Sequence, residues 1–233
     1  DVHARLGDWT KSRGEDPRAE YDLAEAVYAR ALGLEPDNLA ALANRAIVWQ
    51  SLGEWMASRG LDPLAAYGRA LKGLDEALRV APLADESANN RGIVHQLMAA
   101  WKLRHGEDPA GEIEEATKAF EHALEINPRS GQAASNLGTM HLMVAREGER
   151  RGKETEDLCR KAMEAYERAL SINPRHAMAI MNIAVAHQVL GDSRARRGKD
   201  PSEEYKLAVD GYRRALEVNP GLAEAANNMC VSL

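Results

Sequence analysis

Histidines recur in this sequence with a common period. His3, His95, His141 and His187 are separated by 46 residues or by twice that number, and Trp49 fills the remaining place in the series. A column of imidazoles on successive helices would suggest a metal site. Neighbouring helices, however, pack about 10 Å apart, whereas Zn–N bonds are only about 2.0–2.1 Å long. We therefore interpret these side chains as core histidines with one hydrogen bond each, and we expect no metal.

Other reactive residue types are present but are not arranged for catalysis. The acid pairs Glu114-Glu115 and Glu203-Glu204 fall near expected helix starts, where negative charge is favourable. Cys159 and Cys230 match no disulfide or metal spacing, so reduced thiols are the simplest interpretation. The sequence shows no nucleophile–base pair and no phosphate-binding glycine loop. It therefore predicts a protein that is not an enzyme and that uses no cofactor.

A repeated segment marks the helices on which these residues would lie. The pattern A-L-x-x-x-P begins at Ala31, Ala77, Ala123, Ala169 and Ala215, so each copy starts 46 residues after the previous one (for example 77 − 31). A fixed period of this size is the mark of a repeat array. Because proline cannot donate a hydrogen bond into a helix, each copy also marks the end of a helix.

Within one period we expect two helices. Asp37-Asn38 can cap a helix whose apolar positions are three and four apart, and this helix should run to about Ser58. The turn 59–63, with the sequence RGLDP, then supplies a glycine stop, an aspartate N-cap and a proline at the first position of a second helix. This turn recurs in the other periods except at 151–155. There we expect Thr155 to be the cap and the connection to be looser.

Composition and charge narrow the classes of partner. The 233 residues carry a formal net charge of −6, which argues against a nucleic-acid partner because phosphate binding needs clustered cations. No apolar run approaches the roughly 20 residues of a membrane-spanning helix, and we expect no signal peptide. We expect a cytoplasmic protein that binds no membrane. The chain starts at Asp1 and stops inside the pattern at Leu233, so we also expect a piece of a longer protein.

The second helix of each period carries a known signature. Ala116, Phe120, Ala123 and Pro128 match the A-x₃-F…P pattern of the tetratricopeptide repeat (TPR), and related residues fill the same places in the other copies. The chain thus resembles the TPR family along its whole length. The period alone would also suit HEAT or armadillo repeats, but the spacing in the second helix favours TPR. The family's unit has about 34 residues, and we expect the extra residues to lengthen both helices.

The resemblance implies an all-α fold, a right-handed superhelical solenoid of antiparallel helix pairs. It divides the chain into a partial repeat at 1–36, whole repeats at 37–82, 83–128, 129–174 and 175–220, and a partial first helix at 221–233. Trp9, Trp55 and Trp101, with Tyr21 and Tyr67, fall in the lengthened parts of the helices. We expect them to form added core, although a tryptophan stripe could instead mark an interface.

The resemblance also implies a binding surface on the concave face, which the first helices line. An asparagine recurs there every 46 residues, although Asn is a poor residue inside a helix. Its amide could bind the main chain of an extended peptide or could bond to neighbouring helices, and both alternatives stay open. The candidate binding residues are Asn44, Ile47, Gln50, Asn90, Ile93, Gln96, Asn136, Thr139, Met178, Met181, Asn182, Val185 and Gln188. This face lacks the Lys/Arg set that would grip a terminal carboxylate.

Three functions are compatible with these observations. The first is a non-catalytic scaffold that binds a protein or peptide segment on its concave face. The second is a structural array that self-assembles head to tail through complementary uncovered ends. The apolar residues of those ends are Val2, Leu6 and Trp9 on one side and Leu222, Ala226, Met229 and Cys230 on the other. The third is the regulatory arm of a larger multidomain enzyme, such as a bacterial Ser/Thr kinase.

Overall fold

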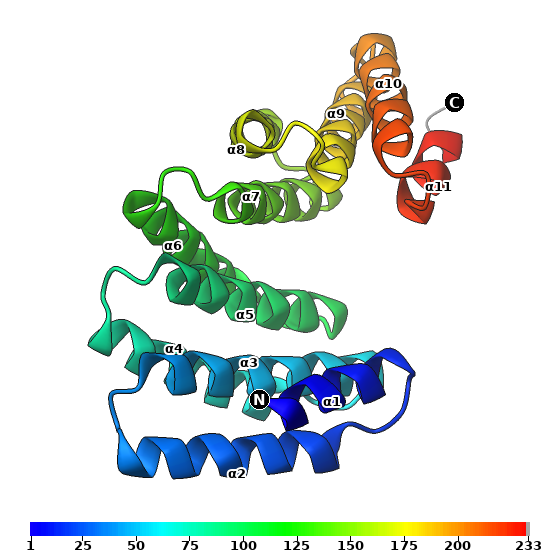
Figure 1. Ribbon diagram of the computed structural model, residues 1–233. Helices are drawn as coiled ribbons and strands as arrows, with labels where there is room; N and C mark the ends of the chain where they lie inside the picture. The colour runs from blue at the N-terminus through cyan, green and yellow to red at the C-terminus, as the bar shows by residue number, and fades with distance from the viewer. Residues whose placement is uncertain (232–233) are drawn as a thin grey trace. The chain divides into compact units, whose positions relative to one another are not determined.

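The computed structural model describes residues 1–231 and the side chains of residues 1–229 (Figure 1). In this part of the chain every regular element is an α-helix. The side chain of Cys230 and the terminal Leu233, on which predictions were made above, lie outside the described residues. The chain divides into two compact units, Asp1–Ile126 and Asn127–Leu233, which are described separately.

Unit 1 consists of three helix pairs. Its first helices are α1 (Val2–Ser12), α3 (Leu39–Ser58) and α5 (Asp85–Arg104), and its second helices are α2 (Arg18–Leu34), α4 (Leu64–Val80) and α6 (Ala110–Ile126). Figure 1 shows each pair as an antiparallel hairpin. Within the unit, α2 also packs on α3 and α4 on α5, so the pairs stack in chain order. The predicted antiparallel helix pairs are confirmed.

Unit 2 repeats this arrangement. Its first helices are α7 (Gly131–Arg150) and α9 (Ala177–Arg196), its second helices are α8 (Glu156–Ile172) and α10 (Ser202–Val218), and α11 (Ala223–Val231) packs on α10. The whole first helices of both units have 20 residues and the second helices have 17. The helix starts repeat every 46 residues, for example from Leu39 to Asp85.

The turn chemistry explains where the helices stop and start. Gly60 follows α3 with φ of +72°, a left-handed conformation that glycine adopts without strain. The Asp62 carboxylate then accepts a hydrogen bond from the Leu64 N–H over 2.9 Å, but the N-cap residue is Pro63, so α4 begins one residue later than predicted. Pro63 lies immediately before the helix, and α4 ends at Val80, two residues before Pro82. The predicted helix ends at Ser58 and before Pro82 are confirmed.

Thr155 occupies the predicted cap position of α8 but does not cap the helix with its side chain. Its Oγ1 instead donates to Glu149 Oε2 over 3.2 Å. Both residues are buried, with exposed fractions of 1% for Thr155 and 6% for Glu149. The predicted cap position of Thr155 is therefore confirmed, although its hydroxyl group bonds the buried Glu149 carboxylate and forms no hydrogen bond to the backbone of α8.

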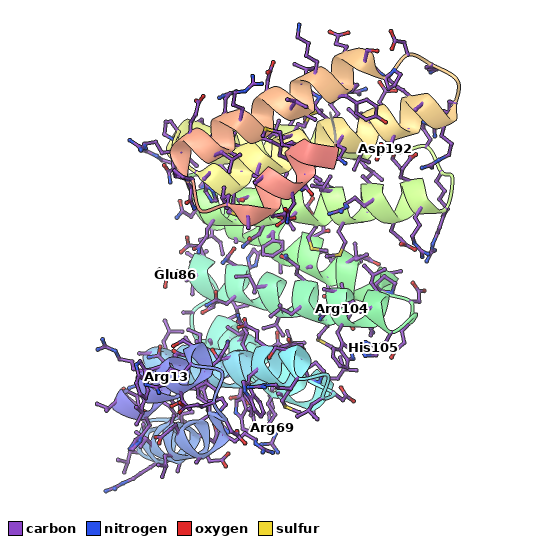
Figure 2. The ribbon with its side chains drawn as sticks, turned by 90° about the vertical axis from the view of Figure 1, so that its right-hand side faces the viewer. Arg13, Arg69, Glu86, Arg104, His105 and Asp192 are labelled. Atoms are coloured by element: carbon purple, nitrogen blue, oxygen red, sulfur yellow. The ribbon has the colours of Figure 1, made fainter. Side chains whose placement is uncertain are left out.

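Large rings fill the lengthened parts of the hairpins. Trp55 and Trp101 are 7% and 6% exposed, which confirms them as core, whereas Trp9 is 53% exposed. Trp9 was wrongly predicted as core: α1 packs against α2 and α3, and neither helix covers its ring. Figure 2 labels His105 at the turn after α5. Its ring stacks on Trp101 with ring centroids 3.8 Å apart.

Candidate functional site

The candidate residues of unit 1 lie at equivalent places on two first helices. They are Asn44, Ile47 and Gln50 on α3, and Asn90, Ile93 and Gln96 on α5. We call these six residues the amide face of unit 1. Asn44 and Ile47 are exposed, Ile47 by 40%, and the other four are half-buried. The face therefore presents amides and branched apolar side chains to the surface of the unit.

Most of these amides have no partner in the protein. Among the described residues, the side chains of Asn44 and Asn90 form no hydrogen bond, and Gln96 Oε1 is buried without a donor. Gln50 is different because its Nε2 donates to Glu54 Oε1 over 3.0 Å. A buried acceptor left unpaired costs about 1–3 kcal/mol. The amide face of unit 1 thus has hydrogen-bonding capacity that the fold itself does not use.

Tyrosines of α2 and α4 pack behind α3. Tyr21 donates from its hydroxyl to Asp8 Oδ1 over 2.8 Å. The hydroxyls of Tyr28 and Tyr67 have no hydrogen-bond partner among the described residues, although the two side chains are only 8% and 1% exposed. Burial raises the pKa of Tyr28, and burial together with the negative charge of Glu54 raises the pKa of Tyr67 to about 12. Both hydroxyls are therefore protonated near neutral pH and can donate.

A hollow of about 180 Å³ lies among α1, α2 and α3. Asp8 of α1, Tyr28 of α2 and the amide-face residues Asn44 and Ile47 of α3 all line it. The hollow therefore joins an acidic group, an unpartnered hydroxyl and an unpartnered amide to an apolar side chain.

In unit 2 the corresponding polar groups are bonded to tyrosines. The Tyr166 hydroxyl lies 3.1 Å from Thr139 Oγ1 and also hydrogen-bonds the amide of Asn182. The Tyr212 hydroxyl donates to Gln188 Oε1 over 2.6 Å. These contacts favour the second alternative left open for the asparagines, a bond between neighbouring helices, but they do so in unit 2 only.

The remaining candidates of unit 2 differ in accessibility. Met178 is 43% exposed, whereas Met181 and Val185 are 1% and 4% exposed. Asn136 is half-buried on α7. Met181 and Val185 therefore support the face from within, and a ligand would not reach them in this conformation.

The difference between the two units follows from the sequence. Gln188 and its partner Tyr212 are 24 residues apart. At the same distance from Gln96 the chain has Phe120, which has no hydroxyl, and at the same distance from Gln50 it has Leu74. This spacing was visible in the sequence, but its meaning depended on knowing that the two helices place these side chains in contact.

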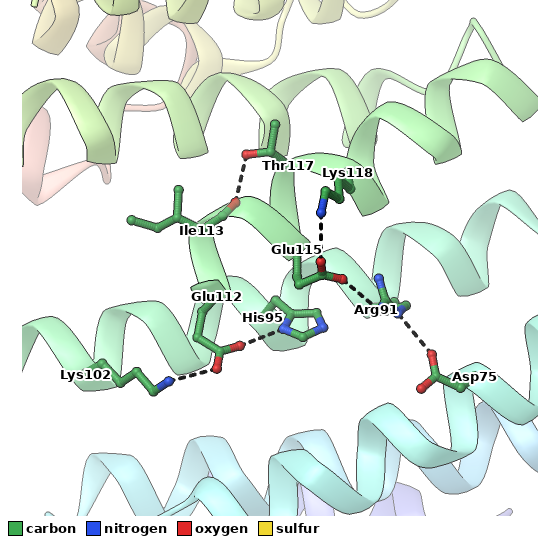
Figure 3. A network of polar contacts seen from close by, with 9 residues as sticks. All are labelled: Asp75, Arg91, His95, Lys102, Glu112, Ile113, Glu115, Thr117 and Lys118. Carbon is green, nitrogen blue, oxygen red and sulfur yellow. Dashed lines mark hydrogen bonds and ion pairs between the residues drawn. The ribbon is translucent and has the colours of Figure 1, made fainter. Parts of the chain in front are cut away.

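The histidine series is tied to acidic residues of the second helices. His95 Nδ1 lies 2.7 Å from Glu112 Oε2, and Lys102 donates to the other carboxylate oxygen over 2.9 Å (Figure 3). Burial raises the pKa of Glu112, but the hydrogen bonds from Lys102 and His95 outweigh burial and hold the pKa below its usual value. With His95 8% exposed, the prediction of a core histidine with one hydrogen bond is confirmed there.

The same pair recurs elsewhere in the series. His187 Nδ1 lies 2.7 Å from Glu204 Oε2, and His3 Nδ1 lies 3.5 Å from Glu20 Oε2. Each pair is 17 residues apart, a regularity that the sequence analysis missed. His141 is the exception, because Leu158 stands at that distance. No group of three or more His, Cys, Asp or Glu side chains among the described residues is arranged to hold a metal ion.

A second hollow, of about 330 Å³, lies among α4, α5 and α6. Arg91 is its central cation and forms ion pairs with Asp75 over 3.0 Å and Glu115 over 3.1 Å (Figure 3). Lys118 pairs with Glu115 in turn. These charges neutralise one another, so the second hollow offers a ligand less unused bonding capacity than the amide face does.

Comparisons with known proteins show which folds this geometry is similar to. A tetratricopeptide repeat model matches residues 109–130. The solved structure of TTC0263, a thermophilic TPR protein of Thermus thermophilus, has a TM-score of 0.62 at 18% identity and aligns over 99% of this chain and 97% of its own. MamA protein has a TM-score of 0.53 at 21% identity, over 96% of this chain and 93% of its own.

A third solved structure is YrrB, described as "a TPR protein with an unusual peptide-binding site". Its TM-score is 0.52 at 17% identity, over 97% of this chain and 89% of that one. No curated protein sequence matches the chain. Within residues 1–231, no helix is long and apolar enough to cross a membrane. The chain therefore contains a matched tetratricopeptide repeat at residues 109–130, and its helix pairs share the fold of solved TPR proteins.

Proposed function

We propose that this chain is a non-catalytic scaffold that binds an extended peptide segment of a partner protein, and that the amide face of unit 1 makes the contact. One observation carries the proposal: the side chains of Asn44 and Asn90 have no hydrogen-bond partner among the described residues, whereas Asn182, at an equivalent place in unit 2, is bonded to Tyr166. An extended peptide has unpaired N–H and C=O groups along its main chain. Side-chain amides can satisfy both kinds of group because they donate and accept.

The apolar members of the face would add contact area. Ile47 is 40% exposed and would bury part of this surface against the side chains of a peptide. The description of YrrB, which shares the fold, also refers to a peptide-binding site. The face is the concave one in the family that the sequence resembles, and we propose that this also holds here.

The proposal is tested with peptides selected from a displayed library of short random sequences against the whole chain. Replacement of Asn44 and Asn90 together by Ala should weaken a selected peptide about tenfold, because each hydrogen bond contributes about 0.5–1.5 kcal/mol. The unfolding midpoint should change little, since neither amide is bonded in the protein. The proposal is wrong if no peptide is selected, or if the selected peptides bind the double variant as tightly as they bind the original chain.

Asn182→Ala is the matched control in unit 2. It removes a bond to the buried Tyr166 hydroxyl, so it should lower stability while leaving the affinity of the selected peptides unchanged. Loss of peptide affinity in this variant alone would move the site to unit 2.

Head-to-tail self-association is a second candidate, favoured by the surface of α1. Val2, Leu6 and Trp9 are 77%, 39% and 53% exposed. Their counterparts 46 residues on, Val48, Leu52 and Trp55, are buried against α2 at 3%, 8% and 7% exposure. A second-helix surface of another copy would cover the same kind of face. Light scattering should show an increase in mass with concentration that Trp9→Lys abolishes, and a constant mass would eliminate this candidate.

A further inference from the structure

We infer that the hollow among α1, α2 and α3 is a side-chain pocket for a lysine of the bound peptide. This inference rests on the proposed function, because Asn44 and Ile47 belong both to the amide face and to the hollow. A peptide lying along the face would pass the mouth of the hollow and could place one side chain in it. Its volume of about 180 Å³ limits the occupant to a single side chain.

The polar groups of the hollow suit an ammonium ion. The acceptors that line it include the Asp8 carboxylate, the hydroxyl oxygen of Tyr28 and the amide oxygen of Asn44. A lysine ammonium has three N–H donors. Of the two Asp8 oxygens, Oδ1 already accepts from Tyr21, which orients the carboxylate and leaves Oδ2 without a protein donor among the described residues. Ile47 would pack against the aliphatic stem.

Tyr28 indicates that the hollow is built for a ligand. Its side chain is only 8% exposed and lines the hollow, yet its hydroxyl has no hydrogen-bond partner among the described residues. The hydroxyl oxygen is not one of the buried unpaired atoms of the described residues, so it opens to the hollow and is available to an occupant. An ammonium group in the hollow would supply the missing bond.

The charges in the hollow favour a cation. Asp1 and Asp8 contribute two carboxylates and Arg5 contributes one guanidinium, so the side chains of the lining carry a net charge of −1. Asp1 Oδ1 is engaged at the start of α1, where it accepts from the His3 N–H over 3.0 Å. Asp8 is therefore the carboxylate available to the occupant.

Unit 2 contains a natural comparison. Asp192, Tyr205, Tyr212 and Asn228 stand four periods after Asp8, Tyr21, Tyr28 and Asn44, and Tyr205 donates to Asp192 over 2.9 Å as Tyr21 donates to Asp8. There, however, Tyr212 donates to Gln188 over 2.6 Å and is bonded to Asn228.

Residue 4 explains the contrast. Ala4 stands four periods before Gln188, and its side chain is too short to reach the hydroxyl of Tyr28. Ala4 and Tyr28 both line the hollow, so the Tyr28 hydroxyl stays open to an occupant. The same set of residues is therefore closed in unit 2 and open in unit 1.

The test uses the peptides selected against the whole chain. The inference predicts that they share a lysine at a fixed place, and that replacement of this lysine by norleucine, which keeps the stem and removes the charge, weakens binding about tenfold. Asp8→Asn keeps an acceptor for Tyr21 and should weaken the lysine peptide by the same factor. It should leave the norleucine peptide unaffected.

Two further variants sharpen the test. Ala4→Gln should fill the hollow and satisfy Tyr28, as Gln188 satisfies Tyr212, and should therefore abolish the preference for lysine over norleucine while the protein stays folded by circular dichroism. Asp22→Asn on α2 removes an exposed carboxylate outside the hollow and should leave the preference intact.

The results separate this inference from the proposed function. Suppose that the selected peptides bind the Asn44/Asn90 double variant more weakly. If they show no preference for lysine over norleucine, or if Asp8→Asn retains that preference, the pocket is refuted and the scaffold function stands. If the peptides bind the double variant unchanged, both are refuted.

Discussion

Tyrosine hydroxyls provide the sharpest test of why the two units differ, because removing or adding one oxygen atom should have three different effects. Tyr212→Phe removes the donor to Gln188, 2.6 Å away, and leaves a buried acceptor unpaired. Tyr28→Phe removes a hydroxyl that has no partner among the described residues. Phe120→Tyr adds a hydroxyl where Gln96 Oε1 is buried without a donor.

The expected magnitudes follow from these contacts. An acceptor left unpaired in Tyr212→Phe should cost about 1–3 kcal/mol of unfolding free energy. Tyr28→Phe should change it by less than about 0.5 kcal/mol. Phe120→Tyr should increase it by about 0.5–1.5 kcal/mol, since Tyr166 and Tyr212 already hold a hydroxyl at the equivalent places with 0% exposure.

Urea unfolding can read the two units separately. All four tryptophans, Trp9, Trp49, Trp55 and Trp101, lie in unit 1. Tryptophan fluorescence therefore reports on unit 1, which contains Tyr28 and Phe120, whereas far-ultraviolet circular dichroism reports on both units. Equal losses in Tyr28→Phe and Tyr212→Phe, or a loss in Phe120→Tyr, would refute the assignment of unsatisfied groups to unit 1.

Three further predictions concern packing, pH and thiol reactivity. A Cβ at Gly53 would lie 2.4 Å from the Tyr67 ring, so Gly53→Ala should lower the unfolding free energy by about 1–3 kcal/mol, while Gly68→Ala, with nothing within 4 Å, should raise it by about 0.4–1 kcal/mol. Burial, and then the positive charge of Lys161, lowers the pKa of His141 from 6.5. Neutral His141 therefore makes its full contribution to the unfolding free energy above pH about 6.5, and this contribution is lost as the pH falls below that value. In His141→Tyr, the unfolding free energy should decrease less between pH about 7.5 and pH about 5.5 than it does in the original chain. Burial, and then the negative charge of Glu149, raises the pKa of Cys159 to about 12, so a thiol reagent should label Cys159 only after unfolding, as peptide mass spectrometry would show.

The helix layout could be predicted because its signals are local. The proline of each A-L-x-x-x-P segment, the glycine of each turn and the spacing of apolar residues each act within a few residues of the chain. They placed the end of α3 at Ser58 and the end of α4 before Pro82, where the structure has them. The sequence also placed Thr155 at the N-cap of α8, but it did not predict the hydrogen bond of Thr155 to the buried Glu149 carboxylate, which no capping rule anticipates.

The properties of the candidate face could be predicted only in part. The recurrence of asparagine identified a series, but it could not show which members were already bonded. That depends on the residue 16 positions earlier, on a second helix. Before Asn182 this residue is Tyr166, whose hydroxyl bonds the amide. Before Asn90 it is Leu74, whose side chain has no polar atom. In the same way, Val185 stands three periods after the exposed Ile47 but is itself buried in unit 2. Periodicity assigns a residue to a face, and the neighbouring helix decides whether that face is open.

These contrasts suggest how a uniform array acquires a specific site. The scaffold keeps its rings packed on glycines, as Tyr67 packs on Gly53 and Tyr166 on Gly138, so helix positions stay fixed from one period to the next. Function can then change through single side chains that alter which polar groups remain unpaired. Ala4 in place of a glutamine opens the hollow beside Tyr28, and Phe120 in place of a tyrosine leaves Gln96 without a donor. Each change costs some stability locally, and a bound peptide would return it, so binding and folding would be coupled most strongly in unit 1.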